Sequence, residues 1–337
     1  MDDYFRELID RTKDRVLSGH VTDRKVLKEF LSLPTDSEEC LYLRGAARSV
    51  RDELYGNYVS INTAIGLDWA PCKGDCSFCS FGSRWGLVKD SILYTDDEIL
   101  DIVKGVYSKG YRSFTLRTTE FYDFDRLLTL GRKIGAMLPK KDFRLGVNTG
   151  ELTTEQCNEL YECGYSSAYH MVRLREGVDT PFDPEVRLRT MHNIHRSKLK
   201  LGASIDPLGV EHTDDEILDK MYFIEQFGLS NIGVMRRICV PGTPKGEYPI
   251  VSDDRMAQIV AALRMYRRDK TVSGAQTSRQ VLQSGSCSMT VEIGASPRRC
   301  GMINDRWYIM DHDEAQQFIK DAGCVYGTPK PSFVNDR

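Results

Sequence analysis

Three cysteines, Cys72, Cys76 and Cys79, lie within eight residues of this chain, and Phe78 stands directly before the last of them. Thiolates are soft ligands, and three of them can hold a metal centre that keeps one metal position open. A structural zinc site would need a fourth ligand at a short, regular spacing. No cysteine, histidine or carboxylate stands at such a position. The spacing therefore favours a cubane iron–sulfur cluster with one iron free for a substrate or cofactor. Chance or disulfide use of the cysteines is the alternative.

The composition of the chain limits what kind of protein it can be. Its 337 residues are 41% hydrophobic, which suits one barrel-type domain with additions. The formal net charge of −3 gives no argument for nucleic acid or an anionic membrane as a partner. No apolar run approaches the roughly 20 residues that span a bilayer, and the polar first ten residues are unlike a signal peptide. Ten cysteines without such a signal indicate a reducing compartment, so we expect a cytoplasmic protein.

The elements that must position the cysteines begin after a charged, helical first segment. Apolar residues such as Leu8, Leu27 and Phe30 recur at intervals that fit one buried helical face. Pro34 interrupts the pattern, so we expect two or three helices in an N-terminal helical extension over residues 1–55.

From residue 58 onward, short β-rich runs alternate with helical runs. Repeated strand–helix units imply parallel strands joined by crossovers, and this many units suit a closed barrel. We therefore expect an α/β fold with a (β/α) TIM-type barrel, complete or nearly so, over residues 56–299. A C-terminal extension, 300–337, would close it. The expected strands lie near 58–65, 113–116, 144–147, 167–172, 199–205, 231–235, 272–275 and 290–293.

Two helix starts locate the face of the barrel that carries the chemistry. Thr95 and Thr213 are each followed three residues later by a glutamate, Glu98 and Glu216, and then by an Ile-Leu pair. This is the capping-box pattern, so each threonine marks the boundary between a loop and a helix. The residues just upstream, including the cysteine loop, therefore lie at the carboxyl ends of strands, which is the catalytic face of such a barrel.

In this context the cysteine triad and Phe78, following a strand, resemble the radical S-adenosylmethionine superfamily. The likeness covers roughly residues 58–299, and finer motifs are similar to the biotin synthase group, which includes methylornithine synthase and hydrogenase-maturation relatives. The resemblance implies that Cys72, Cys76 and Cys79 bind a [4Fe-4S] cluster whose fourth iron is chelated by S-adenosylmethionine. It also implies a 5′-deoxyadenosyl radical that abstracts hydrogen from a small-molecule or carrier-bound substrate, and an electron donor such as ferredoxin or flavodoxin.

The resemblance also assigns cofactor contacts, besides Phe78, one residue at a time. Glu120 ends a Thr-Thr-Glu segment where the superfamily has Gly-Gly-Glu for the methionyl amino group. Arg187 opens a motif similar to Arg-Leu-x-Thr-Leu and would reach the methionyl carboxylate. Glu176 follows the fourth strand, where a polar residue can touch the cofactor, and Glu211 ends the fifth-strand motif near adenine. A solvated surface charge is the alternative for each of these residues.

The positions that hold the second cluster of biotin synthase carry other residues in this chain. Aligning the strands puts Thr119, Asn148 and Ala203 near those places, so that auxiliary site is expected to be absent. Three further cysteines, Cys239, Cys287 and Cys300, are instead expected to meet near the mouth of the barrel. If they do, they could hold an auxiliary iron–sulfur cluster; buried free cysteines are the alternative.

These cysteines separate the reactions that the resemblance allows. An auxiliary cluster would favour sulfur insertion of the biotin or lipoyl synthase type, which is our leading expectation from the sequence. Packed free cysteines would favour a carbon-skeleton rearrangement of the methylornithine synthase type, or assembly of a hydrogenase cofactor. A non-catalytic iron–sulfur or zinc-binding interaction protein is the alternative outside the enzymes.

Overall fold

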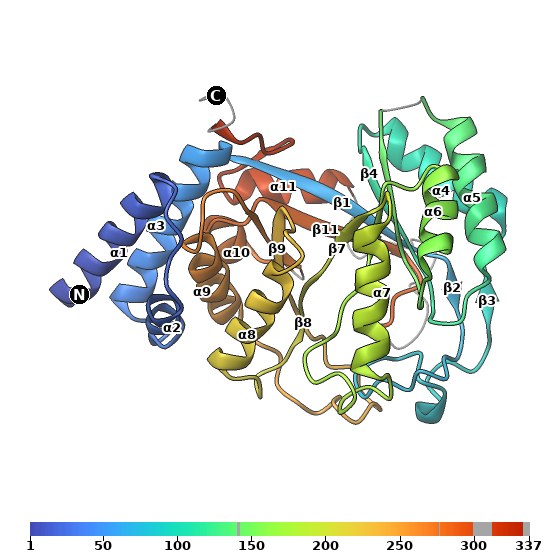
Figure 1. Cartoon of the computed structure of the whole chain (residues 1–337), viewed down its shortest axis with the longest axis horizontal. Coiled ribbons are helices and arrows are strands. Elements are labelled where there is room, and N and C mark those ends of the chain that lie inside the picture. Colours follow the sequence, from blue (N-terminus) through green and yellow to red (C-terminus); the bar gives the residue numbers. More distant parts are fainter. Residues whose placement is uncertain (140–141, 276, 299–311, 333–337) are drawn as a thin grey trace.

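The computed structural model describes residues 1–139, 142–275, 277–298 and 312–332 and has the expected α/β fold. Parallel strands alternate with helices that pack around them (Figure 1). One sheet has the order β11-β1-β4-β5-β6-β7 and a second has the order β10-β9-β8. These strands are β1 (Tyr58–Gly66), β4 (Ser113–Arg117), β5 (Arg144–Asn148), β6 (Ser167–Tyr169), β7 (Lys200–Gly202), β8 (Ser204–Leu208), β9 (Asn231–Arg236), β10 (Thr271–Ala275) and β11 (Ser288–Gly294).

The two sheets follow one another around a barrel-like wall. Only Ala203 separates β7 from β8, so the chain passes directly from the first sheet to the second. At the other junction, the backbone N–H of Cys287 donates to the carbonyl of Val272 over 2.7 Å, just before β11 and within β10. No ladder joins β10 to β11 in the described part of the chain. The sheet is therefore open at this place, and the architecture is similar to a TIM-type barrel.

The structure departs from the expected strands in three places. Strand β6 ends at Tyr169 instead of near residue 172, and the run expected over 199–205 changes partner at Ala203, pairing with β6 before it and with β9 after it. A two-residue ladder of β2 (Asp68–Trp69) and β3 (Ile92–Leu93) frames the cysteine loop. Strands this short have no recognisable sequence period, and a change of partner is a tertiary event.

The N-terminal segment forms three helices, α1 (Asp3–Leu17), α2 (Arg24–Leu31) and α3 (Glu38–Tyr55). The break expected at Pro34 is confirmed, because this residue lies between α2 and α3. Figure 1 shows the three helices at one end of the molecule, beside α8 (Asp214–Glu225) and α9 (Asp253–Arg264). Their apolar faces join the same core as these barrel helices. The division into 1–55, 56–299 and 300–337 stays a prediction.

The capping boxes expected at Thr95 and Thr213 are both confirmed. A third capping box, at Thr153, involves the side chain of Gln156 and begins α6 (Thr154–Glu162). No helix of the described residues is long and apolar enough to cross a membrane. The remaining helices are α4 (Asp96–Ser108), α5 (Phe124–Met137), α6 (Thr154–Glu162), α7 (Pro184–Arg196), α10 (Arg279–Gln283) and α11 (His312–Asp321).

Candidate active site at the carboxyl ends of the strands

The cysteine loop leaves the carboxyl end of β1 and folds back on itself. The backbone N–H of Cys72 donates to the carbonyl of Phe81 over 2.6 Å, and that of Cys79 donates to the carbonyl of Cys76 over 3.0 Å. The ring of Phe81 packs edge-on against Trp69 with the centroids 5.2 Å apart. These contacts fix the loop backbone before any ligand is present.

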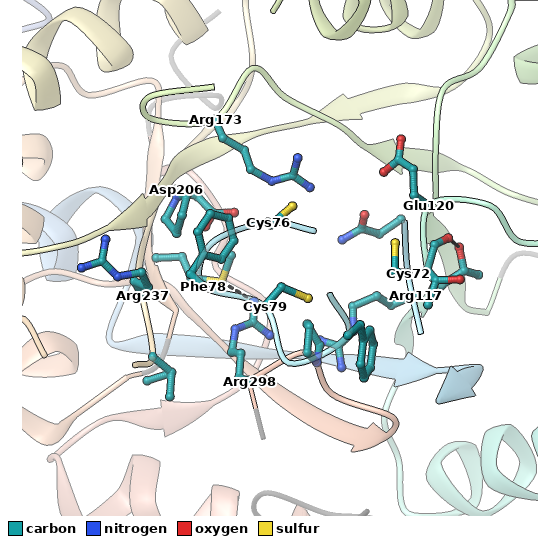
Figure 2. A pocket seen from close by; sticks show the side chains of 18 of the residues that line it. Cys72, Cys76, Phe78, Cys79, Arg117, Glu120, Arg173, Asp206, Arg237 and Arg298 are labelled. Atoms are coloured by element: carbon teal, nitrogen blue, oxygen red, sulfur yellow. Dashed lines mark hydrogen bonds between the residues drawn. The ribbon is translucent and has the colours of Figure 1, made fainter. Parts of the chain in front are cut away.

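All three cysteines of the loop line one cavity. Figure 2 shows their sulfur atoms facing a shared space that Glu120 and Arg173 also border. Phe78 lines the same cavity. The structure therefore brings together the triad, Phe78 and Glu120, as the sequence pattern predicts for a shared site.

Burial controls the charge state of the thiols. It raises the pKa of Cys76 to about 12 and that of Cys79 to about 11, although the Arg173 guanidinium acts in the opposite direction. Both groups are neutral thiols at pH 7 until a metal centre replaces their protons. Three soft donors around one cavity suit such a centre.

Glu120 is held in the cavity wall by Arg187. The two guanidinium Nη atoms of Arg187 lie 2.8 and 3.0 Å from the two carboxylate oxygens of Glu120, a bidentate pair. Glu151 takes a second contact from Arg187 at 2.8 Å, and the ring of Phe182 stacks on the guanidinium at 4.0 Å. Arg187 is 1% exposed and does not itself line the cavity. Its contact with the site thus runs through Glu120.

The loop that carries Glu120 has its own support. Asp68 accepts the backbone N–H of Thr119 over 2.9 Å and also accepts its hydroxyl. A Cβ on Gly150 would lie 2.1 Å from the carbonyl oxygen of Glu120, so only glycine fits there. Hydroxyl contacts therefore anchor a loop in which the superfamily has two glycines.

Arg173 is one of the charged side chains that border the site (Figure 2). It lines the cavity, whereas Glu176 does not. The carboxylate of Glu176 accepts the backbone N–H of Arg173 over 2.7 Å, lies 3.4 Å from its guanidinium and accepts the Thr180 hydroxyl. Arg175 points away from the cavity and pairs with Glu216 at 2.9 Å. Glu176 is thus placed behind the wall, where it orients Arg173.

A second group of charges closes the cavity from the side of β11. Glu292 lies 3.0 Å from Arg117 and also pairs with Arg298, and Ser296 donates to it over 2.9 Å. Burial alone would raise the pKa of Glu292, but the two guanidinium groups outweigh it and lower the pKa to about 2. The carboxylate is therefore ionised at every physiological pH.

Tyr169 stands between this cavity and a deeper one, and Asp206 of the first cavity binds its hydroxyl. The Tyr169 hydroxyl donates to Asp206 over 3.0 Å and also bonds the Ser204 hydroxyl. Burial raises the pKa of Tyr169 well above its usual range and raises that of Asp206. Tyr169 lines both cavities, so it lies where the two meet.

The deeper cavity occupies the inside of the barrel, and polar side chains stand among the apolar ones in its wall. Hydroxyl and amide side chains come to it from strands on all sides of the barrel, and Arg117, Glu292 and Arg298 form its charged end. None of the described residues that line it is a cysteine. The neutral polar side chains are Asn62, Thr115, Asn148, Tyr169, Ser204, Ser230, Asn231, Ser273, Ser288 and Thr290.

Glu211 lies outside the cavity wall. Its carboxylate is bound by Arg237 at 2.6 and 2.9 Å and by Lys245 at 3.1 Å. Burial would raise the pKa of Glu211, but these hydrogen bonds lower it to about 2. The structure places Glu211 in an ion cluster behind the site.

The expected meeting of Cys239, Cys287 and Cys300 does not occur among the described residues, and Cys300 lies outside them. Cys239 follows β9, and its thiol lies 3.8 Å from the carbonyl of Pro249. Cys287 precedes β11 and is 1% exposed. Because β1 and β11 pair in parallel from Ser60 to Gly66, Cys287 lies at the end of the barrel opposite to the cysteine loop, about 20 Å along the strand. The expected position of Cys287 near the mouth of the barrel is therefore wrong, because this residue stands at the start of β11 and the mouth lies at its end.

Sequence reasoning did not select several residues that the structure brings to the site. Arg117, Tyr169 and Asp206 stand at or near the carboxyl ends of β4, β6 and β8, so their position at strand ends was a usable signal. Glu292 lies within β11, where a charged residue in a buried strand was the available signal. Arg298 lies in the loop after that strand and offered none.

Comparison with known proteins finds relatives that are biotin synthases. No protein-family model matches the chain. The biotin synthase of Streptomyces avermitilis is 25% identical over 253 residues, which cover 71% of this chain and 63% of that protein, less than two thirds of its length. The biotin synthase of Persephonella marina is 22% identical over 281 residues, which cover 79% of each chain.

Solved structures share the fold over nearly the whole chain. Methylornithine synthase (PylB) superposes with a TM-score of 0.79 at 17% identity and covers 94% of this chain and 97% of its own. HydG, a maturase of the [FeFe]-hydrogenase, superposes with a TM-score of 0.76 at 17% identity over 97% of this chain and 76% of its own. The structure shows a barrel-type α/β protein in which three thiols line one cavity at the carboxyl ends of the strands. The sequence likeness to biotin synthases supports a place for the chain in the radical S-adenosylmethionine superfamily, and the likeness to PylB and HydG shows the fold.

The likeness to these relatives implies a [4Fe-4S] cluster and S-adenosylmethionine. The donor set of the cavity fits both. Cys72, Cys76 and Cys79 offer three soft ligands to a cluster. Beyond them, the Glu120 carboxylate and the Arg173 guanidinium are suited to an ammonium and a carboxylate group.

Proposed function

We propose that the chain is a radical S-adenosylmethionine enzyme that removes a hydrogen atom from a small polar substrate held inside the barrel. When bound at Cys72, Cys76 and Cys79, the cluster and S-adenosylmethionine supply the 5′-deoxyadenosyl radical for this step. The polar cavity that opens beside the cysteine loop carries the proposal. A position inside the barrel would shield a substrate radical from side reactions with bulk solvent.

The cofactor contacts follow from which charged groups face the cavity. Glu120 faces the cavity and would accept the methionyl ammonium, while Arg187 holds it in place. The Nη atoms of Arg187 are already engaged by Glu120 and Glu151. We therefore assign the methionyl carboxylate to Arg173, whose guanidinium borders the cavity (Figure 2).

The wall of the inner cavity supports one class of reaction over another. Sulfur insertion of the biotin synthase type would need a sulfur source near the substrate, and the described residues of this wall provide no thiol ligand for a second cluster. Cys287 lies at the far end of the barrel, so it cannot join Cys239. We therefore favour a rearrangement or fragmentation of a polar carbon skeleton over sulfur insertion.

We further propose a source of electrons for the reaction and a cellular compartment for the protein. Each cleavage of S-adenosylmethionine consumes one electron, which a ferredoxin or flavodoxin would supply. The nine cysteines of the described chain are all free, which suits a reducing compartment such as the cytoplasm.

Iron and sulfide analysis after anaerobic reconstitution tests the reaction class. We expect about four irons per chain, as one cubane cluster requires. The variant Cys76→Ala should lose the cluster, whereas Cys239→Ala should keep it. About eight irons in the wild type, falling to four in Cys239→Ala, would favour sulfur insertion instead.

Cleavage of S-adenosylmethionine tests the enzyme class itself. Reduced wild-type protein should release 5′-deoxyadenosine, which mass spectrometry detects, and Cys76→Ala should not. A reconstituted wild type that holds a full cluster but forms no 5′-deoxyadenosine would support a non-catalytic iron–sulfur protein.

A further inference from the structure

The cysteine loop is hydrogen-bonded to two other loops of the barrel. The backbone N–H of Ser77 donates to the carbonyl of Asp179 over 2.8 Å, and the backbone N–H of Lys245 donates to the carbonyl of Ser77 over 2.9 Å. Ser77 is the residue between Cys76 and Phe78. The position of the metal-binding loop therefore depends on how the loops carrying Asp179 and Lys245 are held relative to each other.

An ion cluster holds those two loops together. The ammonium group of Lys245 lies 3.2 Å from a carboxylate oxygen of Asp179 and 3.1 Å from one of Glu211. Arg237 adds its bidentate pair with Glu211. All four side chains are mostly buried, so these contacts are weakly screened by solvent. The cluster links loops that follow β6, β8 and β9 to one another.

Two glycines leave room for the ion cluster in the backbone around it. A Cβ on Gly209 would lie 2.3 Å from a Glu211 carboxylate oxygen and 2.4 Å from a guanidinium nitrogen of Arg237. A Cβ on Gly246, the residue after Lys245, would lie 2.4 Å from the carbonyl oxygen of Val240. Larger residues at either glycine would displace the ion pair or the turn that presents Lys245.

The surroundings of the ammonium group resemble a cation site. Asp179, Glu211 and His212 each bring one atom of the kind that binds metals, and these atoms lie within 4.8 Å of one another. Two carboxylates and an imidazole are a common donor set for a divalent metal ion. In this chain the amine of Lys245 already stands between the two carboxylates.

We propose that Lys245 is a covalently tethered cation that takes the place of a metal ion and fixes the cysteine loop for cluster binding. Lys245 is a positioning residue: it acts through Asp179 and Glu211 and touches neither the cluster thiols nor the cavity. The inference rests on the proposed role of the cysteine loop. Its central claim, that one charge orders this loop, concerns the cluster-free protein and can be tested there.

Hydrogen–deuterium exchange of the cluster-free protein is the direct test. In Lys245→Ala, amides of the peptide covering 72–82 should lose protection by about tenfold, because the buried carboxylate of Asp179 loses its cation and its link to Glu211. Lys245→Met keeps most of the length but not the charge, and it should behave in the same way. The matched control is Lys198→Ala, which also removes a lysine that pairs with a glutamate, Glu162, at 2.6 Å and lies over a tyrosine ring. It should leave this peptide unchanged.

Chemical rescue separates the charge from the packing. Methylammonium chloride should restore protection of the 72–82 peptide in Lys245→Ala, where removal of the side chain leaves space, but not in Lys245→Met. Sodium chloride at the same ionic strength should do neither. The reconstituted Lys245→Ala protein should also release iron to a chelator faster than wild type, and methylammonium should slow that release.

Two results would overturn the proposal. One is wild-type protection of 72–82 in both Lys245 variants. The other is equal loss of protection in distant elements such as α5, which would mean general destabilisation. If exchange and rescue behave as expected but reduced wild type forms no 5′-deoxyadenosine, the proposed enzymatic function fails and the role of Lys245 stands.

Discussion

Many charged side chains of the site are buried, and each is paired with side chains of opposite charge. Glu292 with Arg117 and Arg298, and Arg187 with Glu120 and Glu151, each place a guanidinium against carboxylates at hydrogen-bond distance. Removing one partner of such a group leaves an uncompensated buried charge, which costs more than the intact pair contributes. Single substitutions at these positions should therefore have large and separable effects.

The variant Glu292→Gln tests the charge group on β11. The folded-state pKa of about 2 lies below the ordinary 4.5, so ionised Glu292 stabilises the fold above pH 4.5, and this contribution is lost as the pH falls towards 2. The carboxylate side chain is 6% exposed, so we expect the variant to lose about 3 kcal/mol of unfolding free energy at pH 7. In urea denaturation at several pH values, the difference from wild type should shrink between pH 4.5 and 2. A difference that stays constant over this range would contradict the ionised state.

The variant Arg187→Gln tests whether Arg187 serves the cofactor through Glu120. Reconstituted protein should keep its iron, but its affinity for S-adenosylmethionine should fall by about tenfold or more, because Glu120 is no longer held. Isothermal titration with S-adenosylmethionine measures this. The control Arg175→Gln removes a nearby arginine that pairs outside the cavity and should bind the cofactor like wild type. Unchanged affinity in Arg187→Gln would remove it from the site.

At the scale of elements, the position of the cysteine loop depends on how closely the ends of β1 and β11 approach each other. Gly66 ends β1 and Gly294 ends β11, and a Cβ on Gly66 would lie 1.9 Å from the carbonyl oxygen of Ala295. Gly294 has a φ of +76°, a conformation that other residues rarely adopt. The strands can therefore meet at the mouth of the barrel only because both residues lack a side chain.

The variant Gly66→Ala should consequently lose stability by about 3 kcal/mol or more, since a backbone atom would have to move. The control is Gly105→Ala in α4, where an added Cβ would meet nothing within 4 Å. Because alanine is the better helix former, this control should gain up to about 1 kcal/mol. Thermal unfolding of both proteins measures the contrast. A Gly66→Ala protein as stable as wild type would mean that the strands are not in contact there.

At the scale of the whole molecule, the N-terminal helices complete the core of the barrel. Phe30 and Leu27 of α2 are fully buried in the apolar cluster that includes residues of α8 and α9. The cysteine loop adjoins a second cluster, which contains Trp69, and Leu201 packs against both clusters. Contacts of this kind couple the two ends of the molecule, so we expect them to unfold together.

The variant Phe30→Ala tests this coupling. Its cavity should cost about 3–5 kcal/mol, and the change should appear in the fluorescence of the tryptophans near the cysteine loop as well as in far-UV circular dichroism. Leu41→Ala, at a position 54% exposed, should change stability by less than about 0.5 kcal/mol. If fluorescence kept its wild-type midpoint in Phe30→Ala while dichroism shifted, the helices would be an independent unit, as the expected division at residue 55 allows.

Local signals in the sequence determined the spacing of the cysteine triad, the threonine caps of α4 and α8, and the alternation of strands and helices. Each depends on residues within a few positions of one another, because hydrogen bonds of caps and the period of a strand or helix are short-range effects. The resemblance to the superfamily and a position after a strand selected Glu120, and Phe78 lies within the cysteine motif itself.

Only the tertiary structure decided which charged side chains pair with each other and which of them enter the cavity. Arg173 and Arg175 alternate on one segment, but one enters the cavity and the other pairs with Glu216. Cys239 and Cys287 each adjoin a barrel strand, yet they lie at opposite ends of the barrel, because position along the barrel axis depends on register and direction. Ion pairing and ligand convergence depend on distances between separate strands, which no local pattern encodes.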